Sequence, residues 1–182
     1  MKVIKWLLFL VIFLIVAFVV VSMVLPKDYV VEKSVVIDAP SASIHPHIDD
    51  MKAWPNWMTW WQMDDTIKTT YEDPAKGVGA KSSWKSKKDG SAGEATITAS
   101  DPNTGVKYDM AFIMGEGDAA LRADSKTTLA FVKEGEGTRV TWRMEGDMPG
   151  FWGGWLKIAV SASAGVEFEK GLGRLKTLVE GS

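Results

Sequence analysis

Residues 93–110 read GEATITASDPNTGVKYDM, and the alternation within this stretch decides the fold assignment. The apolar positions are Ala95, Ile97, Ala99, Val106, Tyr108 and Met110. Successive side chains of a strand point to opposite faces of a sheet, so these residues share one face. Asp101-Pro102-Asn103 lies between the two runs and has the composition of a tight turn. The stretch therefore predicts an antiparallel hairpin with one apolar face.

The same period of two continues on both sides of this hairpin. Further positions on the apolar face are Ala80, Ser82, Trp84, Phe112, Met114, Leu129, Phe131, Val140, Trp142 and Met144. Residues 29–38 are rich in β-branched side chains and predict a first strand. Asp109, Arg139 and Arg143 fall on the opposite face. Short turns between consecutive strands favour an antiparallel meander with one wet and one apolar face.

Two short helical segments are expected between the first strand and this meander. Ser43 is a candidate N-cap for a helix over about residues 44–51, and Pro55 breaks a second helix or turn. Four tryptophans follow within eight residues, namely Trp54, Trp57, Trp60 and Trp61. They predict either a structural plug at one end of the sheet or an amphipathic rim at a cavity mouth or membrane surface.

Beyond Gly150 the apolar residues recur in steps of three and four, which is typical of an amphipathic helix. The stripe comprises Ile158, Ala162, Gly165, Phe168, Leu172, Leu175 and Val179. Such a helix needs an apolar partner, and the inner face of the sheet supplies it. The sequence therefore predicts an α+β domain with a long C-terminal helix against an antiparallel sheet.

In this order of elements the chain resembles the SRPBCC superfamily, in its START-like branch of polyketide cyclases/dehydrases and lipid-transport proteins. The resemblance runs from about Val31 to Gly181. The matching segments are VEKSVVIDAPSASI (31–44), MKAWPNWMTWWQMDD (51–65), GVGAKSSWKS (77–86), GEATITASDPNTGVKYDM (93–110), GTRVTWRMEGDM (137–148) and FEKGLGRLKTLVEG (168–181). It implies a helix-grip fold, a sheet curled on the long helix. His45-Pro46-His47 departs from the apolar first helix usual in this family.

The resemblance also implies a deep apolar cavity between sheet and helix that holds lipids, polyketides or other hydrophobic molecules. Large side chains on the sheet facing small ones in residues 157–165 leave room for a ligand, or interdigitate into a solid core. The candidate lining residues are Trp84, Tyr108, Met110, Phe112, Trp142, Met144, Ile158 and Ala162. The leading hypothesis is a binding domain for a lipid or other hydrophobic small molecule. The alternatives are a cyclase/dehydrase-like enzyme, for which Tyr108 is the one plausible inner titratable group, and a structural module with a solid core.

Residues 6–25 contain no charged side chain, and at 1.5 Å per residue they span about 30 Å, the thickness of a bilayer's hydrocarbon core. A cleaved signal peptide is the competing interpretation, but the run is longer than usual and no A-x-A-like site follows. Lys2 and Lys5 precede the run, which predicts a cytoplasmic N-terminus and a domain on the periplasmic side. We therefore divide the chain into an anchor, residues 1–28, and a domain, residues 29–182.

Composition excludes several other classes of function. Beyond the apolar run of residues 6–25 there are 19 basic and 23 acidic residues, a net charge of −4, which argues against nucleic-acid binding. The chain has no cysteine, so thiolate nucleophiles, thiolate metal ligands and disulfides are excluded. His45 and His47 are two residues apart and do not share a helix face, which disfavours a metal site. The sequence predicts no catalytic residue, no metal and no cofactor.

Overall fold

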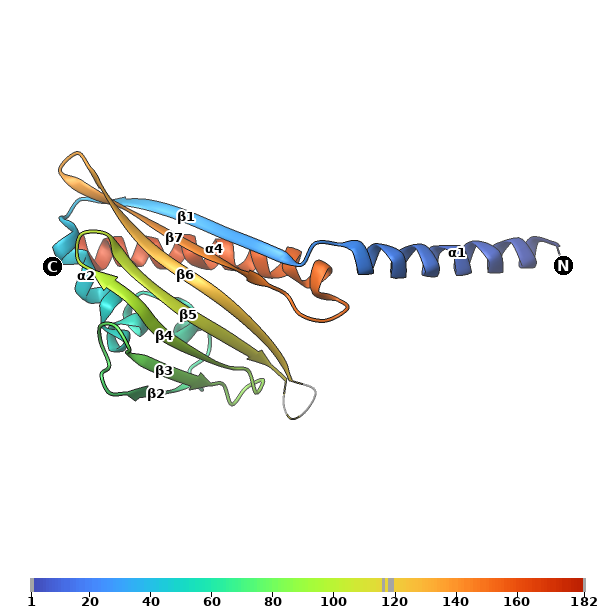
Figure 1. Ribbon diagram of the computed structural model, residues 1–182, viewed down its shortest axis with the longest axis horizontal. Coiled ribbons are helices and arrows are strands. Elements are labelled where there is room, and N and C mark those ends of the chain that lie inside the picture. Colours follow the sequence, from blue (N-terminus) through green and yellow to red (C-terminus); the bar gives the residue numbers. More distant parts are fainter. Residues whose placement is uncertain (1, 116, 118–119, 182) are drawn as a thin grey trace.

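The computed structural model describes residues 2–115, 117 and 120–181. Its elements in chain order are α1 (Lys2–Val24), β1 (Asp28–Ile37), α2 (Ser41–Asp49), the 3-10 helix η1 (Met51–Asn56), α3 (Trp60–Met63), β2 (Lys68–Glu72), β3 (Lys81–Lys85), β4 (Ala92–Asp101), β5 (Gly105–Met114), β6 (Leu121–Glu134), β7 (Gly137–Asp147) and α4 (Gly153–Glu180). Sheet and helices form the predicted α+β arrangement (Figure 1).

The seven strands form one antiparallel sheet in the order β1-β7-β6-β5-β4-β3-β2. From β2 to β7 each strand pairs with the next in sequence, which confirms the meander. β1 returns to the far edge beside β7, and α4 runs along the same edge (Figure 1). The edge strand β2 was not predicted, because its sequence KTTYE carries polar side chains and alternates only between exposed and half-buried positions.

The register of the strands sets the two faces of the sheet. Tyr108 of β5 lies opposite Thr127 of β6, and Thr127 lies opposite Met144 of β7, so these three side chains share the inner face. The outer face is charged, as predicted. There Arg143 bonds Glu32 at 3.1 Å and Glu145 at 3.0 Å.

Helix α4 contributes the second wall of the core. The buried large side chains of its C-terminal half are Phe168, Leu172, Leu175 and Val179, as the stripe predicted. Its first half differs from the prediction, since Ile158 is 58% exposed and Ala162 is also exposed. Successive residues of an α-helix are rotated by about 100° about its axis. Ile158 therefore lies about 80°, and Ala162 about 120°, around the helix from the buried Phe168. The half-buried position on that turn is Ala164.

The segment between β1 and β2 covers one end of the sheet. Trp54 and Trp57 are fully buried, and their indole N–H groups donate to the carbonyl oxygens of Ile48 (2.8 Å) and His47 (2.9 Å). Buried indoles with satisfied N–H groups are typical of core packing. These two tryptophans therefore act as the predicted structural plug, while Trp60 and Trp61 are half-buried.

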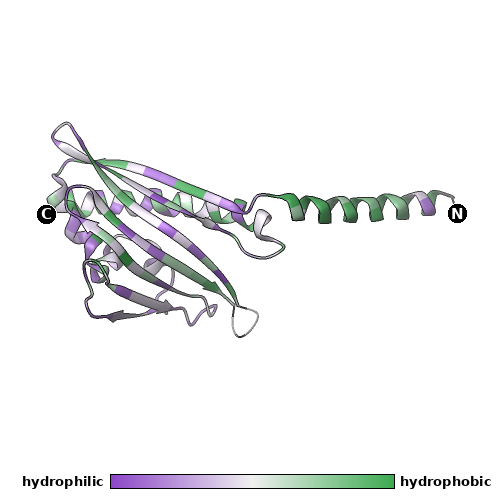
Figure 2. Ribbon diagram, in the orientation of Figure 1, coloured by the Kyte–Doolittle hydropathy of each residue, from purple (hydrophilic) through white to green (hydrophobic). Residues whose placement is uncertain are grey.

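Helix α1 projects from the domain as a continuous apolar rod (Figure 2). By length and composition Val3–Val24 could cross a membrane, and nearly all of it is exposed. Its last turns contact the start of α4, where the Nε1 atom of Trp155 donates to Ser22 Oγ at 2.9 Å. Only residues 25–27 separate α1 from β1.

Candidate ligand-binding site

The six candidate residues of the strands all lie on the inner face of the sheet. Five are buried and Phe112 is half-buried. Register brings them together from β3, β5 and β7, and ring contacts link Trp84 to Phe112 at a centroid distance of 5.9 Å. The other two candidates, Ile158 and Ala162, point away from this interior.

Aromatic rings occupy the space between the sheet and α4. Phe168 of α4 stacks on Trp142 of β7 with ring centroids 3.9 Å apart and planes inclined by 6°. Trp57 meets the same indole edge-on at 5.2 Å. Trp60 contacts Trp142 at 6.2 Å and Phe112 at 5.9 Å, which connects the deep rings to half-buried ones. The interior around Trp142 is therefore closely packed, and Trp60 and Phe112 mark its more open side.

The inner face contains polar atoms that have no partner. Among the described residues, Tyr108 Oη, Thr127 Oγ1 and Trp142 Nε1 are buried without a hydrogen bond, as are Ser82 Oγ and Trp60 Nε1. Protein interiors leave only a few per cent of buried polar atoms unpaired, so such a group indicates a site for water or a ligand atom. Sequence reasoning missed Thr127, because it assigned only Leu129 and Phe131 of this strand to the inner face. The alternation that places Leu129 and Phe131 inward also places Thr127 inward, and pairing of the two strands sets it opposite Tyr108, which could have identified it.

The Tyr108 hydroxyl is a titratable group of this interior, and Tyr29 is a second buried tyrosine of the same core. Burial raises the pKa of the Tyr108 phenol, and weak hydrogen-bond interactions with the Trp142 and Thr127 side chains, which fall short of good geometry, offset only part of that increase. The phenol therefore stays protonated at neutral pH and can donate a hydrogen bond. The buried polar residues that the structure describes are otherwise serines and threonines, with no charged side chain among them. Such a site suits an uncharged polar group.

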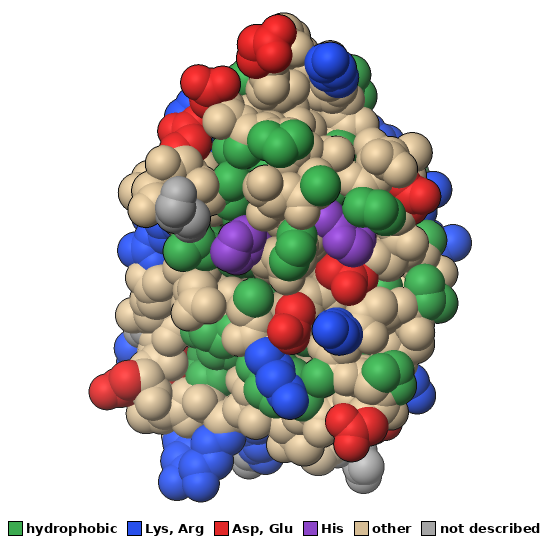
Figure 3. All heavy atoms as spheres, turned by 90° about the vertical axis from the view of Figure 1, so that its left-hand side faces the viewer, with side chains coloured by type: hydrophobic (Ala, Val, Ile, Leu, Met, Phe, Trp, Pro, Cys, Tyr) green, Lys and Arg blue, Asp and Glu red, His purple; other side chains and the backbone are tan. Residues whose placement is uncertain are grey.

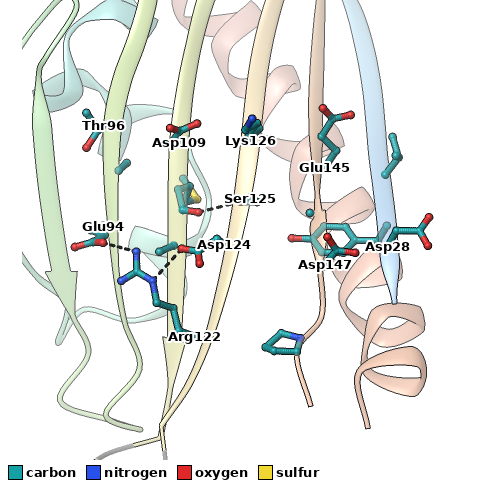
Figure 4. Close-up of a pocket in the computed structure, with 17 residues that line it drawn as sticks. Asp28, Glu94, Thr96, Asp109, Arg122, Asp124, Ser125, Lys126, Glu145 and Asp147 are labelled. Carbon is teal, nitrogen blue, oxygen red and sulfur yellow. Dashed lines mark hydrogen bonds and ion pairs between the residues drawn. The ribbon is translucent and has the colours of Figure 1, made fainter. Parts of the chain in front are cut away.

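A hollow of about 880 Å³ lies on the outer face of the sheet, on the side away from α4 (Figure 4). Arg122 crosses it and pairs with Glu94 (2.6 Å) and Asp124 (2.9 Å), and Asp109 and Lys126 also point into it. A twisted sheet is concave along one diagonal of each face, which accounts for this shape. Its charged groups are well exposed, so their pairing contributes little free energy.

The two histidines lie on the end of the domain away from α1 (Figure 3). Nε2 of His45 lies 2.8 Å from Ser100 Oγ, and Ser100 also bonds the carboxylate of Asp49. Within the described part of the chain, no group of three or more histidine, aspartate or glutamate side chains could hold a metal ion. The histidine His45 thus belongs to a local hydrogen-bond network that joins α2 to β4.

Comparisons with known proteins agree with this architecture. Residues 29–180 match the family described as polyketide cyclase/dehydrase and lipid transport, and the chain belongs to that family. No protein of curated function matches it significantly in sequence.

Solved structures share the fold at low sequence identity. An uncharacterised protein from Rhizobium leguminosarum has a TM-score of 0.63 at 18% identity, over 86% of this chain and 97% of its own. Protein CV1439 from Chromobacterium violaceum has a TM-score of 0.59 at 18% identity, over 83% and 96% of the two chains. DynU16, a protein from the dynemicin biosynthetic locus, has a TM-score of 0.52 at 18% identity, over 83% of this chain and 47% of its own. These likenesses establish the fold alone.

Proposed function

We propose that this protein is a membrane-tethered binding domain for a hydrophobic molecule that carries one uncharged polar group, such as a ketone, ester or alcohol. The ligand would lie between the inner face of the sheet and α4, entering beside Trp60 and Phe112, and it would have to displace part of the ring packing around Trp142. The observation that carries this proposal is the set of unpaired polar atoms at Tyr108, Thr127 and Trp142. The family description, which includes lipid transport, agrees with it.

The chemistry of the three atoms selects the polar group of the ligand. The indole N–H is a donor only, and the two hydroxyls donate and accept. A carbonyl or hydroxyl oxygen would satisfy them together, whereas a carboxylate would bring an unbalanced charge into an interior without a described buried cation. The apolar remainder of the ligand would be held by burial at about 25 cal/mol per Å².

The tether is α1, which we propose is retained as a single-pass anchor with its N-terminus in the cytoplasm and the domain in the periplasm. Its last turns pack against α4, and Ser22 is buried there. Cleavage as a signal peptide would remove this packing and expose the Trp155 indole. The measured mass of the mature protein tests this part directly, since a value short of the full chain by the first 25 or so residues contradicts it.

Binding is favoured over catalysis by the state of Tyr108. Because burial raises the pKa of this phenol, it does not supply a general base at neutral pH. It can still orient a carbonyl oxygen by donating a hydrogen bond. A cyclase/dehydrase-like enzyme remains the alternative candidate and would use the same hydrogen bond.

The test compares three twelve-carbon probes, dodecan-2-one, dodecane and dodecanoate, by titration of the full-length protein in detergent. We expect the ketone to bind more tightly than the alkane and the carboxylate. Tyr108→Phe should weaken ketone binding roughly fivefold, since one hydrogen bond contributes about 1 kcal/mol, and leave alkane binding unchanged. Tyr71→Phe, at a half-buried tyrosine of the edge strand β2, is the matched control.

Each result has a defined meaning. If Tyr108→Phe and the control Tyr71→Phe each bound the ketone and the alkane with equal affinity, the polar atoms would not contact the ligand. Failure of all three probes to bind, in a protein that unfolds cooperatively, would reject the carrier role and favour a domain with a solid core.

A further inference from the structure

Five apolar side chains at the start of α4 are exposed on the surface. Phe151, Trp152, Trp155, Leu156 and Ile158 are 41, 55, 38, 39 and 58% exposed. We call these five residues the collar. Between Asp147 and Glu167 the chain has a single charged residue, Lys157, and its ammonium group donates to the carbonyl oxygen of Asp28 at 3.0 Å. The collar is thus an aromatic and aliphatic surface without free charge of its own.

The collar is continuous with α1. Phe18 stacks on Trp155 with ring centroids 5.5 Å apart and planes inclined by 15°, and it also contacts Trp152 at 5.7 Å. Trp152 in turn meets Phe151 edge-on at 5.3 Å. A Cβ atom at Gly154 would lie 2.6 Å from Leu25 Cβ, so the absence of a side chain there lets α4 approach α1 closely. These contacts fix the collar beside the last turns of α1.

The collar lies at the level where α1 would leave a bilayer. The apolar stretch of residues 6–25 covers about 30 Å, the thickness of the hydrocarbon core. Ser22 and Leu25, the residues that meet α4, lie at its C-terminal end. Tryptophan and phenylalanine partition into the interface between acyl chains and headgroups, and tryptophan is enriched there.

From these observations we infer that the collar inserts into the interfacial layer of the bilayer, so that α1 and the first turns of α4 bind the membrane as one unit. The inference rests on the proposed role of α1 as an anchor. It explains why Ile158 and Leu156 face outward although they are apolar. It also fixes the orientation of the domain, with the start of α4 against the lipid and the β6–β7 turn farthest from it.

Because the chain has no cysteine, single-cysteine variants can report the surroundings of each position. Ile158→Cys and Leu156→Cys test the collar, Leu14→Cys (56% exposed) tests the anchor, and Val132→Cys (59% exposed, near the β6–β7 turn) is the exposed control. Each variant is labelled with the fluorophore NBD and the full chain is reconstituted into phosphatidylcholine vesicles. Lipids with a nitroxide near the headgroup end of the acyl chain, or near its methyl end, serve as quenchers.

We expect the shallow nitroxide to quench both collar labels several-fold more strongly than the Val132 label, and the deep nitroxide to quench the Leu14 label. A quenched Leu14 label with unquenched collar labels would overturn the inference and leave the anchor intact. If the Leu14 label is also unquenched, the anchor itself fails. Unquenched collar labels with blue-shifted emission would mean that protein, such as a second copy of the chain, covers the collar instead, which also overturns the inference.

Discussion

Gly171 of α4 lies directly over the indole of Trp142, so that a Cβ atom at this glycine would come within 3.0 Å of Trp142 Cζ3. Two residues further on, Gly173 has open space where its Cβ would be. The two glycines share one helix but differ in what a methyl group would meet.

This difference predicts that the same substitution has different effects at the two positions. Gly173→Ala should raise the free energy of unfolding by about 1 kcal/mol, the usual gain in helix propensity. Gly171→Ala should be less stable than Gly173→Ala, because the new methyl group presses on a ring already held by Phe168 and Trp57. Urea unfolding of the full chain in detergent measures both. Equal gains for the two variants would contradict the packing described here.

The stacked pair of Phe168 and Trp142 predicts a large loss on truncation. Phe168→Ala should lower the free energy of unfolding by about 3–5 kcal/mol, as expected for a buried phenylalanine. Val166→Ala, at a residue of the same helix that is 50% exposed, should change it by no more than about 0.5 kcal/mol. Denaturant titrations of both variants provide the comparison, and a loss below about 1 kcal/mol for Phe168→Ala would place that ring outside the core.

Removing the unpaired hydroxyl of Tyr108 should not destabilise the ligand-free protein. Tyr108→Phe removes a buried polar atom whose interactions with Trp142 and Thr127 fall short of good hydrogen-bond geometry, so the free energy of unfolding should stay unchanged or rise by up to about 1 kcal/mol. The measurement is thermal unfolding in delipidated detergent extracts. A clear loss of stability would show that an ordered water or protein group already bonds this hydroxyl.

The carboxylate of Glu167 predicts a pH-dependent contribution. A hydrogen bond from the Thr59 hydroxyl lowers its pKa, and Lys170, 3.1 Å away, lowers it further. A lowered pKa means that this carboxylate stabilises the fold above the ordinary glutamate pKa of about 4.3, and that the stabilisation is lost as pH falls through the folded-state value.

Glu167→Gln should therefore cost stability at neutral pH, and its difference from the parent should shrink in acid. Glu169→Gln, at a side chain that is 75% exposed, should show a much smaller pH dependence. Unfolding curves recorded from pH 7 to about pH 3 test this. A difference for Glu167→Gln that stays constant over this range would contradict the lowered pKa.

The hydrogen bond between Trp155 and Ser22 predicts energetic coupling between α4 and α1. Trp155→Phe keeps an aromatic ring against Phe18 but removes the donor, and Ser22→Ala removes the acceptor. A double-mutant cycle should give a coupling of about 1 kcal/mol. Pairing Trp155→Phe with Ser163→Ala, a serine that bonds Val160 within the helix, should give none. Zero coupling in the first cycle would mean that the two helices separate in the membrane.

The strands and their inner face were predictable because the period of two is carried by large residues. Trp142, Met144 and Tyr108 are each flanked by polar or charged side chains, so alternation alone gave the correct face. The edge strand β2 was missed because an edge position needs little apolar surface, and Tyr71 is its one large apolar side chain.

The prediction for the first half of α4 was wrong for a different reason. The half-buried positions of this segment are Lys157, Val160, Ser161 and Ala164, and Val160 is the one large apolar side chain among them, so the apolar signal there is weak. The predicted apolar stripe therefore included Ile158 and Ala162, which lie on the outer side of the helix. The unpaired atoms of Tyr108, Thr127 and Trp142 were also beyond reach, because hydrogen-bond satisfaction depends on side-chain geometry and not on spacing in the sequence.

Only three residues, Leu25 to Lys27, connect α1 to β1, and a chain of that length reaches about 10 Å at most. Because α4 also packs against α1, the domain cannot move far relative to that helix. If α1 is the membrane anchor proposed above, the domain could not carry a ligand across an aqueous gap to a second membrane. It would act as a binding site held at one membrane, and transfer of its ligand elsewhere would require a mobile acceptor that comes to it.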